Sequence, residues 1–185
     1  GTMLQRAVPV KLHCPELATV DYKSAVQDIH RAYVAAGCNI IQTNTLGGNR
    51  LKLGVYGLSD RVDELNRLAA ATAKEAVRET PGIMVAGDIG PSGRLMAPMG
   101  DLTFAEAVDV FREQAASLAA GGADLILIET MADVHEAKAA AIGARMACDL
   151  PILVSLTYDE DLRTLTGSSP ESAVRPSRST RRASC

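Results

Sequence analysis

The sequence has no tryptophan and few other aromatic residues, which make up 3% of its 185 positions. Proteins that bind single-stranded nucleic acids stack the bases on aromatic side chains, and this chain offers no such platform. Its formal net charge of −3 also argues against a surface that attracts nucleic acid. We therefore expect no nucleic-acid partner.

Long apolar runs and paired cysteines are missing as well. No apolar stretch approaches the roughly 20 residues that a membrane-spanning helix needs, so we expect no membrane partner. The four cysteines, Cys14, Cys38, Cys148 and Cys185, form no C-x-x-C pair, and no signal peptide precedes them. These features predict reduced thiols in a cytoplasmic protein.

The composition is that of a globular domain in which strands and helices alternate. Hydrophobic residues make up 47% of the chain, which is enough for one domain with a sizeable core. Strands are predicted to begin near residues 39, 83, 124 and 152, with helices at about 22–36, 60–79, 103–120 and 134–147. This alternation indicates a parallel sheet, in either a (β/α)₈ barrel or an open doubly wound fold. Because a full barrel needs about 250 residues, four strands would form about half of one.

Glu129 is the strongest candidate for a functional residue. Residues 125–128 are four consecutive apolar residues, typical of a strand covered on both faces, and Glu129 follows at its C-terminal end. In parallel α/β proteins this end of a strand carries the chemistry. The alternative is a carboxylate in a solvated loop. Asp133 and Glu136 then have the spacing of a capping box at the start of the next helix.

Two other segments follow predicted strands. Thr43, Asn44 and Thr45 precede a glycine pair, so their hydroxyl and amide groups either bind a ligand or form an ordinary turn. Asp88 belongs to a glycine-rich segment, 87–93, that lacks the G-x-G-x-x-G spacing of a dinucleotide-binding loop. This aspartate either contacts a ligand or braces the turn. His30 is predicted to pack or to lie on the surface, because metal ligands come in clusters.

Segments 43–45, 87–93 and 128–133 together resemble the homocysteine S-methyltransferase family. Residues 30–33, 98–100 and 166–167 support the resemblance, which covers residues 1–174 in consistent order. It is greatest to the N-terminal homocysteine-binding module of cobalamin-dependent methionine synthases. The resemblance implies a (β/α)₈ TIM barrel, of which residues 1–174 would be a truncated domain containing about the first half.

The resemblance also implies an activity and a binding site. In this family, a zinc ion held by three cysteines binds homocysteine as a thiolate, which attacks a methyl donor such as methylcobalamin to give methionine. It implies that Glu129 holds the amino group of the substrate by a charge-assisted hydrogen bond. Thr43, Asn44, Thr45 and Asp88 would lie at the same mouth. The implied partners are homocysteine and the folate- and cobalamin-binding modules of a longer enzyme.

The departures from the family pattern keep other functions open. The family's zinc cysteines lie on later strands that this chain lacks, so no cysteine is predicted as a ligand and the chain alone is expected to be inactive. The alternatives are a non-catalytic fragment, and an enzyme that uses S-methylmethionine or a betaine. A phosphate-binding barrel is disfavoured, because no glycine-rich loop leads directly into a helix N-terminus. Residues 175–185, with four arginines, are predicted to be a disordered or out-of-frame basic tail.

Overall fold

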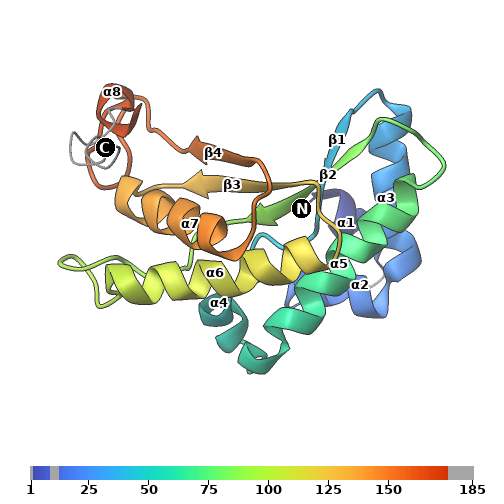
Figure 1. Cartoon of the computed structure of the whole chain (residues 1–185), viewed down its shortest axis with the longest axis horizontal. Coiled ribbons are helices and arrows are strands. Elements are labelled where there is room, and N and C mark those ends of the chain that lie inside the picture. The colour runs from blue at the N-terminus through green and yellow to red at the C-terminus, as the bar shows by residue number, and fades with distance from the viewer. Residues whose placement is uncertain (1, 9–12, 175–185) are drawn as a thin grey trace, which may run out of the picture.

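The computed structural model describes residues 2–8 and 13–174, so the predicted tail at 175–185 lies outside the described residues. The described chain is an α/β fold with one parallel sheet in the order β1-β2-β3-β4 (Figure 1). The strands are β1 (Ile40–Gln42), β2 (Met84–Ile89), β3 (Leu125–Met131) and β4 (Ile152–Leu156). Every neighbouring pair is parallel, which confirms the predicted parallel sheet.

Three long helices connect the strands. They are α5 (Val62–Val77) between β1 and β2, α6 (Phe104–Ala120) between β2 and β3, and α7 (Val134–Ala147) between β3 and β4. A fourth, α3 (Lys23–Ala35), precedes β1. All four lie within two residues of the bounds that the sequence predicts, because apolar residues recur at helical spacing along them, and Thr103 and Asp133 cap the starts of α6 and α7.

Short helices lie before, between and after these elements. They are α1 (Thr2–Ala7), η1 (Pro15–Leu17), α2 (Ala18–Asp21), α4 (Arg50–Gly54), η2 (Ser59–Arg61) and α8 (Pro170–Val174). The sequence gives α1 no clear signal, since a six-residue helix is marginal on its own. Its stability comes from tertiary packing, in which Leu4 joins a small cluster with Ala18 and Val26.

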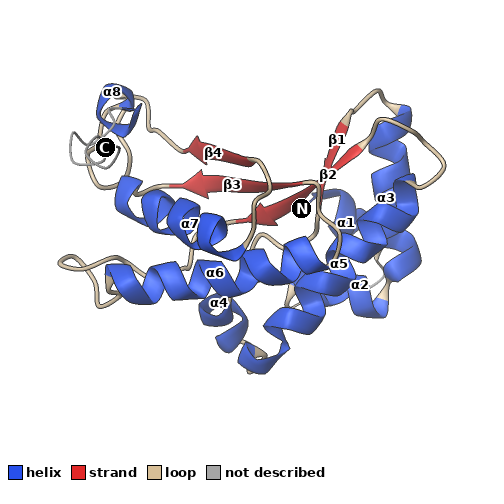
Figure 2. Cartoon of the chain, viewed as in Figure 1, coloured by secondary structure: helices blue, strands red, loops and turns tan. Residues whose placement is uncertain are grey.

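The core lies between one face of the sheet and the long helices (Figure 2). Ile89, Ile126 and Ile128 project from the strands and join Phe111 and Leu118 of α6 in the largest buried cluster. On the opposite face, strand register places Ile40, Met84 and Leu153, which are 40%, 43% and 50% exposed. One face of the sheet is therefore covered by helices and the other is partly open.

The helix caps only partly match the sequence pattern. Thr103 and Glu106 form the reciprocal capping box at the start of α6. Asp133 caps α7 by accepting the His135 N–H, but Glu136 does not complete a box with it. Glu136 is buried instead and accepts hydrogen bonds from the backbone N–H and the hydroxyl of Ser92. The predicted box at Asp133 is therefore wrong, and Glu136 ties α7 to the loop after β2.

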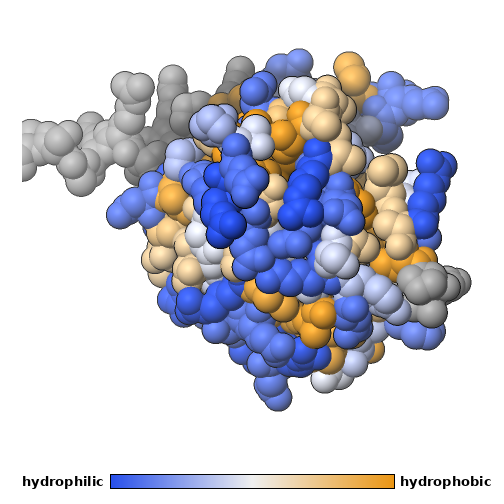
Figure 3. All heavy atoms as spheres, turned by 90° about the vertical axis from the view of Figure 1, so that its right-hand side faces the viewer, coloured by the Kyte–Doolittle hydropathy of each residue, from blue (hydrophilic) through white to orange (hydrophobic). Residues whose placement is uncertain are grey.

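The surface on the side of α3 is mostly hydrophilic, with small hydrophobic areas between the polar side chains (Figure 3). Ion pairs such as Arg31 with Asp28, at 2.9 Å, contribute to it. Of the helices that the structure describes, none combines the length and the apolar character that crossing a bilayer requires.

Candidate functional site

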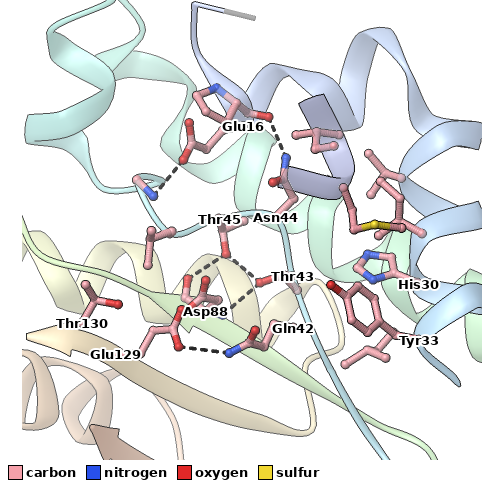
Figure 4. A pocket seen from close by; sticks show the side chains of 18 of the residues that line it. Glu16, His30, Tyr33, Gln42, Thr43, Asn44, Thr45, Asp88, Glu129 and Thr130 are labelled. Atoms are coloured by element: carbon pink, nitrogen blue, oxygen red, sulfur yellow. Dashed lines mark hydrogen bonds between the residues drawn. The ribbon is translucent and has the colours of Figure 1, made fainter. Parts of the chain in front are cut away.

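A pocket of about 890 Å³ opens where β1, β2 and β3 end and extends along β1 towards α3 (Figure 4). Its lining includes all five residues singled out from the sequence: Thr43, Asn44, Thr45, Asp88 and Glu129. The C-terminal ends of parallel strands meet at one edge of the sheet, so residues from distant parts of the chain converge there. The pocket is polar at the strand ends and apolar where α1 and α3 line it.

Glu129 lies near the end of β3 and is half-buried. Its carboxylate accepts a hydrogen bond from the side-chain amide of Gln42, with 3.2 Å between Nε2 and Oε2. The sequence reasoning missed Gln42, although Gln42 also ends a strand and meets the criterion that identified Glu129. The amide orients the carboxylate without neutralising it, because an amide carries no charge.

A bulge at the end of β3 sets the direction of Glu129. The register against β4 shifts between Ile128 and Met131, and Thr130 between them has a φ of 60°. In a regular strand Glu129 and Met131 would face the same side. Here Met131 is fully buried in the main cluster while Glu129 lines the pocket. The extra residue thus separates a core side chain from a pocket side chain.

Asp88, near the end of β2, is only 5% exposed. Its Oδ1 atom is buried and has no hydrogen-bond partner among the described residues. Burial raises the pKa of Asp88 to about 8, and repulsion from Glu129 and Glu16 adds to the effect. The carboxyl group therefore carries its proton at neutral pH and is a hydrogen-bond donor there.

Thr43 and Thr45 use their hydroxyl groups inside the protein. Thr45 donates to the Asp88 carbonyl at 2.7 Å, and the backbone N–H of Asp88 donates to the Thr43 oxygen at 2.9 Å. The two hydroxyl oxygens lie 2.6 Å apart, and because the Thr45 proton is already used, Thr43 donates to Thr45. This arrangement favours the turn-forming interpretation of the two threonines, which brace the loop against β2.

The N-terminal segment holds the same loop from its other side. Asn44 donates to the Pro15 carbonyl at 2.6 Å, and the Gly47 N–H donates to the buried Glu16 carboxylate at 2.8 Å. Cys14 donates to Glu16 as well, and burial together with this bond raises the pKa of the thiol to about 11. No sequence signal marks Glu16, because Gly47, its partner in the loop, is distant in the chain.

The sequence leaves two positions open for His30, packed inside the protein or exposed on its surface, and the structure does not place it on the surface. It is 6% exposed and lines the apolar part of the pocket, and its Nε2 atom has no partner among the described residues. Burial lowers the pKa of His30 to about 4, so the imidazole is neutral. The packing interpretation of His30 agrees with this burial.

The described residues do not fit a zinc site. Among them, no three histidine, cysteine or acidic side chains come together as a metal-binding group. Cys14 donates to Glu16, and Cys148 donates to a carbonyl of its own helix. Cys38 lines the pocket without a second thiol beside it. Zinc in proteins is usually held by three or four such ligands, so these positions do not supply one.

In α/β proteins with a parallel sheet, small-molecule sites commonly lie at the edge where the strands end, and here polar groups gather around a pocket at that edge. The family model described as homocysteine S-methyltransferase matches residues 1–182, and the chain belongs to this family. The resemblance predicted from the motifs is therefore confirmed.

Two curated relatives are methionine synthases. Those of Mycobacterium tuberculosis and Mycobacterium leprae are 32% and 31% identical over alignments of 164 positions, and each alignment covers 84% of this chain. The chain spans only 14% of the length of either relative.

Solved structures of the homocysteine methyltransferase MmuM from Escherichia coli have the same fold. The oxidized form gives a TM-score of 0.76 at 20% identity, covering 89% of this chain and 62% of that one. The metallated form gives 0.79 at 19%, covering 93% and 66%. At these identities the likeness establishes the fold alone.

Proposed function

We propose that this chain is a homocysteine-binding part of a homocysteine S-methyltransferase, built as about the first half of a (β/α)₈ TIM barrel. Membership of the family and the likeness to MmuM support the proposal. The sheet supports it as well, because a barrel wall has helices on its outer face and side chains filling its interior. The open face with Ile40, Met84 and Leu153 corresponds to that interior.

The carboxylate of Glu129 is the observation that carries the proposal. Homocysteine bears an ammonium group, a carboxylate and a thiol. Glu129 presents an oriented carboxylate to the pocket and suits the ammonium group through a charge-assisted hydrogen bond. Protonated Asp88 beside it suits an oxygen of the substrate's carboxylate. The loop that carries Thr43, Asn44 and Thr45 forms the adjoining wall.

Methyl transfer joins the homocysteine sulfur to the methyl carbon while the bond between that carbon and the donor breaks. The likeness to methionine synthases favours methylcobalamin as the donor, with folate- and cobalamin-binding modules as partners in a longer cytoplasmic enzyme. The described residues supply no set of zinc ligands, and their part in this step is to hold homocysteine. We propose that the chain by itself binds homocysteine without transferring a methyl group.

Replacing Glu129 by glutamine tests this function. Glu129→Gln keeps the shape of the side chain and removes its charge, so we expect homocysteine binding to weaken by about 1.5–3 kcal/mol, the range for a hydrogen bond to a charged group. Calorimetric titration of homocysteine into the chain measures this. Glu79→Gln, which removes a charge from an exposed turn outside the pocket, is the matched control. Equal affinity of the wild type and Glu129→Gln would sink the proposal.

A further inference from the structure

The loop from Thr43 to Gly48 forms one wall of the pocket, yet it has no regular secondary structure. Loops of this kind are mobile unless other groups hold their backbone. Two buried amide side chains reach this loop from the helices behind the sheet. They are Asn66 of α5 and Gln114 of α6, and both are 0% exposed. Neither lines the pocket.

Gln114 joins the loop to β2. Its Nε2 atom donates to the Thr45 carbonyl at 2.8 Å and lies 3.4 Å from the Asp88 carbonyl. The same Asp88 carbonyl accepts the Thr45 hydroxyl. The backbone of Thr45 and that of Asp88 therefore meet at one buried amide, which fixes the distance between the loop and the strand end.

Asn66 holds the far end of the loop. Its Nδ2 atom donates to the Gly48 carbonyl at 2.8 Å and to the Val62 carbonyl of its own helix at 2.7 Å. Its Oδ1 atom lies 3.3 Å from Nε2 of Gln114, so the two amides also contact each other. Burying an amide is costly unless it is hydrogen-bonded, and these donors are directed at loop carbonyls.

Gly48 shows how closely the loop packs on this pair. A Cβ atom at this position would lie 2.6 Å from Oδ1 of Asn66 and 2.9 Å from Nε2 of Gln114. A larger residue would therefore displace either the loop or the two amide groups. The contact between the loop and the two amides is therefore steric as well as polar.

We propose that Asn66 and Gln114 are positioning residues, which act through the Thr45–Gly48 backbone to hold the pocket wall and the end of β2 in the geometry that binds ligand. The part of this inference that names homocysteine as the ligand rests on the proposed function. A purely structural role would give a different result, because side chains of similar volume would fill the same space and only global stability would change.

Two substitutions separate these roles. Gln114→Met and Asn66→Leu keep most of the side-chain volume and remove the donors. Phe111→Leu is the control, since Phe111 is fully buried on α6, three residues before Gln114, and belongs to the main apolar cluster. Hydrogen exchange is measured at the amides of Gly48 and Gly90, which donate to the Thr45 and Leu46 carbonyls. Global stability and homocysteine affinity are measured in the same chains.

We expect exchange at Gly48 and Gly90 to quicken by about tenfold or more in Gln114→Met and Asn66→Leu, beyond the change that global stability explains. A tenfold change corresponds to about 1.4 kcal/mol. The dissociation constant for homocysteine should rise about tenfold in both variants and stay unchanged in Phe111→Leu. The proposal is overturned if exchange at Gly48 and Gly90 changes only as much as global stability does in all three variants. It is also overturned if a variant exchanges faster at these amides but binds homocysteine with unchanged affinity.

The exchange measurement does not depend on the ligand. If the wild-type chain fails to bind homocysteine, the proposed function is refuted, and exchange at Gly48 and Gly90 still decides whether the amides position the loop. If Asn66→Leu does not fold, Gln114→Met carries the same comparison, because the Gln114 amide reaches carbonyls of both the loop and β2.

Discussion

Asp88 is the residue whose ionisation is most tightly linked to folding in the pocket. Its pKa is raised to about 8 in the folded chain from an ordinary value of 3.8. Between about pH 4 and pH 8, the folded protein therefore keeps the Asp88 proton that the unfolded chain releases. The free energy of unfolding gains most from Asp88 below about pH 4 and loses that gain as the pH rises through about 8.

Asp88→Asn should remove this dependence, because an amide does not titrate. We expect the variant to gain stability relative to the wild type as the pH rises from about 5 to about 8. Denaturant unfolding at a series of pH values measures the difference. The charges of Glu129 and Glu16 face Asp88 in the wild type and remain in the variant. The effects of their own titration on stability therefore largely cancel when the two pH profiles are subtracted. Parallel pH profiles for the two proteins would contradict the assignment.

At the end of β3, Thr130 adopts a strained backbone conformation that allows the strand to bulge. Thr130 is β-branched and has a φ of 60°, a backbone conformation that such residues rarely adopt. Strain of this kind costs on the order of 1–3 kcal/mol and persists where the surroundings impose it. Here the bulge lets Met131 enter the core while Glu129 enters the pocket.

Thr130→Asn should therefore stabilise the chain by about 1 kcal/mol, since asparagine tolerates left-handed backbone better than threonine. Thermal or denaturant unfolding measures the change. Thr80→Asn is the control, because Thr80 is an exposed threonine outside the left-handed region. A loss of stability in Thr130→Asn would show that the threonine side chain makes contacts worth more than the strain.

Local sequence signals predict helices of several turns. They do not predict short helices whose formation depends on contacts with residues distant in the chain. The bounds of α7 follow from Asp133 as the N-cap and from its apolar pattern. The short helix α4 was missed although Asn49 caps it locally, because it is only five residues long and depends on Leu53 being buried by distant groups. Such contacts have no periodic signature in a single sequence.

The same contrast holds for the candidate site. Strand-end reasoning places Glu129, Asp88 and the Thr43–Thr45 segment in one pocket, because the ends of parallel strands converge. It gives no indication of Gln114, which meets Thr45 across 69 positions in the chain. A helix glutamine among alanines has the same local pattern whether it faces solvent or a buried carbonyl.

At the scale of the whole molecule, the described sheet has two open edges. The bonds of β1 to β2 use the Asn39 carbonyl and the Thr43 N–H, so the alternate residues Ile40 and Gln42 turn their backbone groups outward. At the other edge, Leu153 and Val154 of β4 are 50% and 49% exposed. Parallel sheets are normally covered on both faces, and open edges are templates for pairing with another chain.

We therefore expect the chain to self-associate, with a sedimentation coefficient that rises with loading concentration. Leu153→Lys should reduce this association, because a lysine on an edge strand disfavours pairing and keeps the open face solvated. Ile142→Lys is the control, since Ile142 is an exposed apolar residue on α7, outside the sheet. Equal effects of the two lysines would attribute association to general surface hydrophobicity. A single monomeric species at every concentration would mean that the edges and the open face are protected in solution.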